Sequence, residues 1–187
     1  MSGLRPAEEH SDDARIIHAA RADLTQFAPL YERYFPRIYA YCLRRVEHRH
    51  AAEDLTSAIF TRALKGLHEY RDGSVAAWLF RIAHNVVANH YRGRRPQLSL
   101  EETDSDLAAD HPSLIENILQ DEQSRIIRGL VAALPDNQRE MLSLKLDGGL
   151  TAEEIGAALG KSAGAVRVEL HRIIKRLRAR YEEEHRA

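Results

Sequence analysis

The sequence has a single cysteine, Cys42, among its 187 residues. One cysteine excludes an intrachain disulfide and fits a reducing cytoplasm. The chain also lacks an apolar run as long as a membrane span, and its first ten residues lack the apolar core of a signal peptide. We therefore expect a cytoplasmic protein without membrane insertion.

Aromatic residues and prolines are scarce, at 6% and six residues, whereas hydrophobic residues make up 44% of the chain. Val, Ile and Thr never gather into the alternating runs that strands require. A chain of this composition should fold, and the absence of strand patterns favours helices. The sequence therefore predicts an all-α fold.

Motifs for catalysis are absent as well. The chain has no His-Glu-x-x-His, no glycine-rich phosphate loop and no cysteine cluster. Among ten histidines, His48 and His50 do not share a helical face, and His84 and His90 lie about 120° apart on theirs. We expect no enzyme, no metal site and no cofactor.

The net charge of −1 conceals a strong pattern. Residues 25–95 carry 12 basic and 6 acidic groups, residues 96–124 carry 8 acidic and no basic groups, and residues 125–187 carry 12 and 9. Two basic blocks around an acidic segment indicate two polyanion-facing domains. Solvated helix faces and an ordinary tether would give a similar pattern, so both interpretations stay open.

Hydrophobic periodicity divides the chain into four parts. Residues 1–23 form an N-terminal extension of undefined role, and residues 24–95 a small helical domain. Residues 96–112 form a flexible acidic linker whose composition continues to 124, and residues 113–187 a second helical domain. Apolar residues recur at helical spacing from Leu24 to Val46, Leu24 and Tyr31 included, and this spacing predicts one buried stripe.

The C-terminal domain contains a helix-turn-helix pattern that begins at Leu150. Thr151 and Glu154 have capping-box spacing, Gly160 suits a left-handed helix end, and Ser162 can cap the next helix. That second helix should bury Val166, Leu170, Ile173, Ile174 and Leu177 and turn a basic face outward. This geometry suits a DNA major groove, although a helical hairpin with a solvated face would share the pattern.

A third predicted helix, capped by Ser74, runs to about Tyr91. Its core face includes Trp78, Leu79, Ile82, Ala83, Val86, Val87 and His90. The opposite face carries a polar stripe that can follow a nucleic-acid backbone. The stripe consists of Arg81, Asn85, Asn89 and Arg92, and it leads to Arg94 and Arg95.

Two segments together resemble the extracytoplasmic-function (ECF) sigma factors of bacterial RNA polymerase. The stretch LPDNQREMLSLKLDGGLTAEEIGAALGKSAGAVRVELHRIIKRL resembles the family's region 4. The stretches FAPLYERYFPRIYAYCLRRV, AEDLTSAIFTRAL and AAWLFRIAHNVVANHYRGRR resemble region 2. The resemblance implies a polymerase subunit that selects promoters through −35 and −10 elements and initiates transcription.

The resemblance also assigns expected roles to positions of this sequence. It implies core polymerase binding, through the β′ clamp helices, by Glu53, Asp54, Leu55, Thr56, Phe60 and Arg62. It implies −10 contacts, to duplex and single-stranded DNA, by Tyr70, Arg71, Asp72, Arg81, Asn85, Asn89, Arg92, Arg94 and Arg95. It implies −35 contacts by Ser162, Ala165, Arg167, Val168, Glu169, His171, Arg172 and Lys175.

Further partners implied by the resemblance are the polymerase β flap and an anti-sigma factor. Region 4 departs from the family's frequent pattern at Ala165, Val168 and Glu169, which indicates a different −35 sequence. The competing hypothesis is a polymerase-independent helix-turn-helix regulator. Such a regulator would bind duplex DNA tightly as the free protein, and a sigma factor of this kind would not.

Overall fold

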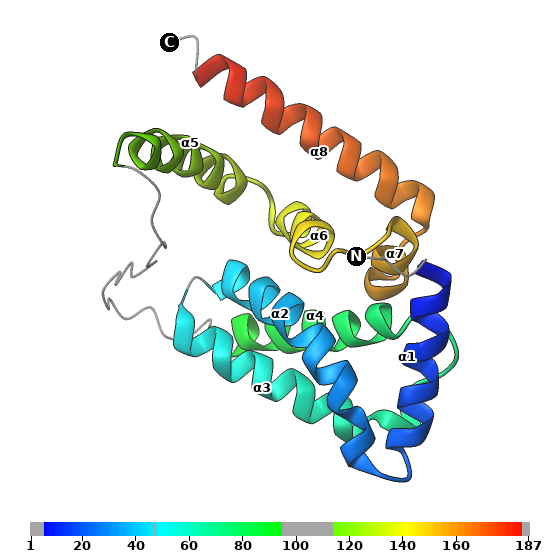
Figure 1. The fold of residues 1–187 in the computed structure, drawn as a ribbon. Helices are drawn as coiled ribbons and strands as arrows, with labels where there is room; N and C mark the ends of the chain where they lie inside the picture. The colour runs from blue at the N-terminus through cyan, green and yellow to red at the C-terminus, as the bar shows by residue number, and fades with distance from the viewer. Residues whose placement is uncertain (1–5, 47, 95–113, 185–187) are drawn as a thin grey trace.

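The computed structural model describes residues 6–46, 48–94 and 114–184, with side chains within 12–46, 48–92 and 123–184. All regular elements in these ranges are helical, which confirms the predicted all-α fold (Figure 1). The acidic linker at 96–112, Arg95 and the side chain of Arg94 lie outside the described parts. No helix in the described ranges is long and apolar enough to cross a bilayer.

The N-terminal domain contains four α-helices and two short 3₁₀ turns. Helix α1 spans Pro6–Ala20, α2 Ala28–Val46, α3 Arg49–Lys65 and α4 Val75–Arg94, and the turns are η1 (Leu24–Phe27) and η2 (Leu67–Glu69). Helices α2, α3 and α4 pack on one another. The predicted cap of α4 is confirmed, because Ser74 Oγ accepts a hydrogen bond of 3.1 Å from the Ala77 backbone N–H.

Helix α1 belongs to the core of this domain, although the sequence left the role of residues 1–23 undefined. Ile17 and Ala20 are fully buried. The buried carboxylate of Asp13 accepts a 2.5 Å hydrogen bond from the Tyr34 hydroxyl and forms an ion pair with Arg33. From the end of α1, Arg21 donates to the backbone carbonyl of Tyr70, at 2.7 Å, so the helix also holds the segment before α4.

The C-terminal domain contains the remaining four helices. Helix α5 spans Leu114–Ala132, α6 Asp136–Leu146, α7 Ala152–Leu159 and α8 Ala163–Glu184. The long α8 packs on α5, α6 and α7 (Figure 1). Its contacts bury Val166, Leu170 and Ile173, which recur at spacings of four and three residues as one helical face requires.

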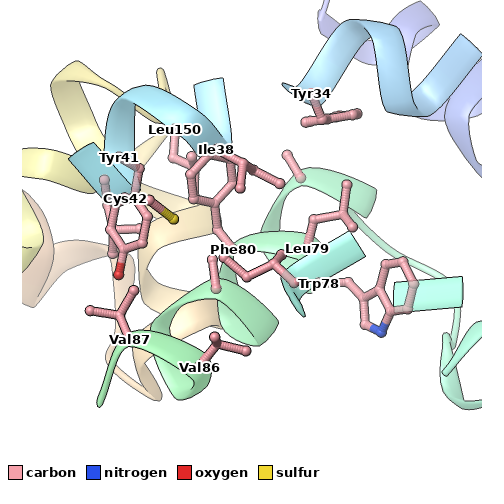
Figure 2. Close-up of a cluster of buried hydrophobic side chains, with 14 of the residues drawn as sticks. Tyr34, Ile38, Tyr41, Cys42, Trp78, Leu79, Phe80, Val86, Val87 and Leu150 are labelled. Atoms are coloured by element: carbon pink, nitrogen blue, oxygen red, sulfur yellow. The ribbon is translucent and has the colours of Figure 1, made fainter. Parts of the chain in front are cut away.

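The two domains share one hydrophobic core. Helix α7 packs on α4, and α6 packs on α2. Leu150, between α6 and α7, is fully buried with Ile38, Tyr41 and Phe80 of the N-terminal domain in the same cluster (Figure 2). The domains therefore meet at an extensive junction, which the sequence did not predict.

Three side chains that the sequence placed in the buried stripes of Leu24 to Val46 and of α8 are exposed. Leu24 is 61% exposed because it lies in η1, before the α-helical repeat of α2 begins. Tyr31 is 44% exposed because it follows the buried Leu30 and lies at the edge of the stripe. Ile174 is 49% exposed since the buried face of α8 is narrower than predicted. Ile82, His90 and Leu177, also predicted as core, are only partly buried.

Candidate nucleic-acid interface

The start of α7 has the predicted reciprocal capping box. Thr151 Oγ1 accepts a hydrogen bond of 3.2 Å from the Glu154 backbone N–H, and Glu154 Oε2 accepts one of 2.8 Å from the Thr151 N–H. Two backbone donors that the helix leaves unpaired are thereby satisfied. This fixes the first helix of the helix-turn-helix.

The turn between α7 and α8 depends on two glycines. Gly160 adopts a φ of 69°, the left-handed conformation that a helix C-cap favours. A Cβ on Gly156 would lie 2.5 Å from the Lys161 carbonyl oxygen, so only glycine permits this close approach. Ser162 Oγ then accepts from the Ala165 N–H at 3.2 Å and caps α8 as predicted. The sequence prediction of a helix-turn-helix is confirmed.

The outward face of α8 is polar and basic. Val168 is 51% exposed. Glu169 Oε2 lies 3.0 Å from Lys161 Nζ, and Arg167 pairs with Glu153, so both acids near this face are matched by a base. The predicted contact residues that the structure leaves exposed are Ser162, Ala165, Arg167, Val168, His171, Arg172 and Lys175, whereas Glu169 is partly buried. An exposed helix of this kind can enter a major groove.

Helix α4 presents the predicted polar stripe to solvent. Arg81, Asn85, Asn89 and Arg92 are all exposed, and Arg92 Nη2 donates to Asn89 Oδ1 at 2.6 Å. Below the stripe lies an open groove of about 440 Å³ between the end of α3 and the start of α4. Its lining combines cations with an aromatic ring, in Arg62, Lys65, Glu69, Trp78, Arg81 and Asn85. Such a groove suits an unstacked base and its phosphate.

A third surface, on α2 and α3, combines an acidic end with exposed rings. Glu53 and Asp54 are exposed in the first turns of α3, and Arg49 Nε lies 3.0 Å from Glu53 Oε1. Phe60 lies seven residues after Glu53 and therefore on the same helical face. The aromatic patch, defined as Tyr31, Phe35, Tyr39 and Phe60, has neighbouring ring centroids 4.7–6.4 Å apart. Tyr31 and Phe35 are exposed, whereas Phe60 is buried.

Comparison with protein families matches both halves of the chain. The model for Sigma-70 region 2 matches residues 30–97, and the model for Sigma-70, region 4 matches residues 124–177. The ECF RNA polymerase sigma factor ShbA of Streptomyces griseus is 34% identical over 187 residues, which cover 94% of this chain and 98% of ShbA. This chain belongs to the ECF family of RNA polymerase sigma factors.

Other relatives agree with this sigma factor assignment. The ECF sigma factor BldN of Streptomyces coelicolor is 31% identical over 182 residues, covering 92% of this chain and 68% of BldN. The fold resembles CnrH, solved with the cytosolic domain of CnrY, at a TM-score of 0.68 and 22% identity over 91% of this chain and 97% of that one. Sigma factors are initiation factors and not enzymes, as the sequence predicted.

The structure separates the residues that the sequence grouped as polymerase-binding. Leu55, Thr56 and Phe60 are buried, and the Thr56 hydroxyl donates to the Ala52 carbonyl at 2.7 Å. These three side chains therefore belong to the interior of the N-terminal domain and not to its surface. Arg62 lies nine residues after Glu53, on the opposite side of α3, and lines the groove beside Arg81.

The predicted −10 residues before α4 differ in their exposure to solvent. Arg71 and Asp72 are exposed, whereas Tyr70 is 3% exposed and its hydroxyl donates to the Gly73 carbonyl at 2.7 Å. Sequence reasoning missed the exposed rings of Tyr31 and Phe35. The signal was present, since Tyr31, Phe35 and Tyr39 recur every four residues along one edge of α2.

Proposed function

We propose that this cytoplasmic sigma factor directs core RNA polymerase to promoters by reading the −35 element with α8 and the −10 element with α4. The observation that carries the proposal is the pair of exposed polar helix faces, one in each sigma region. In α8, Arg172 can pair with a base edge while Lys175 neutralises phosphate. Ala165 and Val168 can contact thymine methyl groups.

The −10 contact combines duplex and single-stranded DNA. The exposed Asn85 and Asn89 can hydrogen-bond base edges, and Arg81 and Arg92 can neutralise the backbone. The groove below them offers the exposed cations Arg62 and Lys65 to the phosphate of a nucleotide that has left the stack. A helix face for duplex DNA beside a groove for an unpaired nucleotide suits a protein that opens its promoter after binding it.

Core polymerase binding is assigned to the surface of α2 and α3. Acidic groups at Glu53 and Asp54 beside exposed rings at Tyr31 and Phe35 suit a basic, amphipathic helical partner such as the β′ clamp helices. Region 4 would contact the β flap. An anti-sigma factor is a further expected partner, because the RpoE protein of Bartonella quintana was solved with the anti-sigma factor NepR and has a TM-score of 0.65 to this chain at 24% identity.

Charge reversal tests the polymerase contact. Glu53→Lys with Asp54→Lys should weaken retention on immobilised core polymerase by at least ten-fold, because the dock would then repel a basic partner. Glu182→Lys with Glu183→Lys is the matched control, since it reverses two exposed charges at the far end of α8. Wild-type retention of the Glu53/Asp54 variant would refute this dock.

An electrophoretic shift assay with and without core polymerase tests the function as a whole. The sigma factor should bind promoter fragments weakly alone and tightly with core enzyme. Tight, sequence-specific duplex binding by the free protein would favour a polymerase-independent regulator instead.

A further inference from the structure

The segment between α3 and α4, residues 66–74, contributes one wall of the groove below the −10 stripe. Gly66 and Glu69 of this segment line the groove. The side chains of Glu69 and Asp72 are exposed, whereas that of Leu67 is buried. The segment therefore has one side toward solvent and the groove and another toward the interior of the domain. The turn η2 orders three of its residues, and the shape of the others depends on contacts from neighbouring elements.

Arg21 holds this segment through two backbone carbonyls. The end of α1 lies beside the segment (Figure 1), and Arg21 directly follows α1. Its Nε donates a hydrogen bond of 3.0 Å to the Leu67 carbonyl, and its Nη2 donates one of 2.7 Å to the Tyr70 carbonyl. Because the guanidinium is planar and carries its donors in a rigid fork, the two hydrogen bonds fix one carbonyl relative to the other. Arg21 therefore constrains the curvature of the chain from Leu67 to Tyr70.

The position of Arg21 is itself fixed by α1. Its backbone N–H donates to the Ile17 carbonyl at 3.2 Å, and Ile17 and Ala20 are fully buried. Arg21 Nη1 lies 3.1 Å from His18 Nδ1, which accepts because arginine has only donors. A neutral His18 then carries its proton on Nε2, which lies 3.9 Å from Asp72 Oδ1. All three guanidinium nitrogens are thus engaged, and the third contact leads on to an exposed residue of the segment.

Recognition of an unpaired base depends on such constraints more than attraction to its phosphate does. A base is distinguished from its competitors only where the groups that contact it are held rigidly in place. Attraction of a phosphate to Arg62 or Lys65 falls off slowly with distance and carries no sequence information. A loosened segment would therefore leave the affinity for DNA nearly unchanged and lower the preference among bases.

We propose that Arg21 is a positioning residue for recognition of the unpaired −10 nucleotide, because it holds the groove wall against which that base is distinguished. Arg21 acts through the segment and not by contact with DNA. Its consequence for DNA rests on the proposed function, whereas its hold on the segment does not. Arg21 precedes residue 30, where the match to Sigma-70 region 2 begins, so the N-terminal extension contributes to −10 recognition.

Hydrogen exchange in the free protein tests the hold on the segment. The Glu69 amide donates to the Gly66 carbonyl at 2.9 Å and is protected while the segment keeps its shape. In Arg21→Ala this amide should exchange about ten-fold faster or more, because hydrogen bonds from a charged group contribute at least that factor. Arg15→Ala, which removes an exposed cation of α1, is the matched control and should leave the rate unchanged. An unchanged Glu69 rate in Arg21→Ala would overturn the proposal.

Transcription by the holoenzyme from a library randomised in both promoter elements tests the recognition. Arg21→Ala should lower the preference for the favoured base at a −10 position by about five-fold or more, the lower end of what one base pair discriminates. Preferences in the −35 block should not change, and Arg15→Ala should keep both blocks. A merely structural defect would lower transcription from all templates alike and leave the base preferences intact, and that result would contradict the positioning role.

Arg21→Lys keeps the test decisive if the alanine variant folds poorly, which circular dichroism checks. Lysine retains the charge and the apolar stem but lacks the planar fork. The lysine variant should therefore fold, yet show faster Glu69 exchange and a weaker −10 preference. Wild-type values of both in this variant would mean that charge alone matters and would overturn the proposal. If the wild-type protein selects no −10 block, the proposed function fails, whereas the exchange rates still decide whether Arg21 holds the segment.

Discussion

Replacing Asp13 by alanine should destabilise the N-terminal domain, and the structure sets the size of the effect. The carboxylate is 2% exposed and accepts a hydrogen bond of 2.5 Å from Tyr34, whose side chain is itself buried. A buried hydroxyl left without an acceptor costs about 1–3 kcal/mol. Arg33, the other partner, is 38% exposed and is hydrated again when the carboxylate is removed. The loss of its ion pair therefore adds little to the destabilisation. We therefore expect a loss of roughly 1–3 kcal/mol in the free energy of unfolding.

Urea unfolding followed by circular dichroism measures this loss of stability, and two further variants serve as comparisons. Asp12→Ala is the matched control, because Asp12 is 56% exposed and lies 3.6 Å from Arg33, so its removal should cost less than about 0.5 kcal/mol. Adding Tyr34→Phe to Asp13→Ala should recover part of the loss, since no polar group is then left buried and unpaired.

The reasoning is refuted if Asp13→Ala costs no more than Asp12→Ala, or if the double variant is less stable than the sum of the two single variants. Either result would mean that α1 contributes no buried polar contact to the domain. The consequence reaches the candidate site, because Arg21 at the end of α1 holds the Tyr70 and Leu67 carbonyls before α4.

Three further predictions concern the DNA faces and the thiol. Arg172→Ala should weaken −35 binding by the holoenzyme by roughly 1–3 kcal/mol in a shift assay, whereas Arg178→Ala, exposed on another side of α8, should not; equal losses would indicate a merely solvated face. Asn85→Ala should reduce promoter opening, seen as permanganate reactivity of unpaired thymines, more than it reduces polymerase binding; an equal loss of both would contradict its DNA role. With its pKa raised by burial to about 12, the Cys42 thiol is ionised in only roughly one molecule in ten thousand at pH 8. Native protein should therefore resist a thiol reagent until urea unfolds it, and rapid native labelling would contradict that burial.

Local features of the fold could be predicted from the sequence because their causes are local. Thr151, Gly160 and Ser162 act on backbone groups within a few residues, and the structure confirms all three roles. The outward direction of Asn85 and Val168 follows from helical periodicity alone. Periodicity wrongly predicted that Leu24 and Ile174 are buried. Leu24 lies in a 3₁₀ turn, and Ile174 lies outside the narrow buried face of α8.

The domain junction could not be predicted, because its partners are far apart in the chain. Glu140 and Tyr41 are separated by 99 residues, and neither position carries a motif. Likewise, only the structure shows the contact between His84 and Glu140. The position of Arg62 in the groove depends on how α3 meets α4, which sequence spacing does not encode.

The central claim, that this chain is a sigma factor reading two promoter elements, is tested most directly by transcription with reconstituted polymerase. Core enzyme and purified protein are incubated with a promoter library randomised upstream of the start site, and the transcribed templates are sequenced. The account predicts two enriched blocks at −35 and −10, with Arg172→Ala relaxing the first and Asn85→Ala the second. Transcription no higher than core enzyme alone, or enrichment of a single palindromic block, would contradict it.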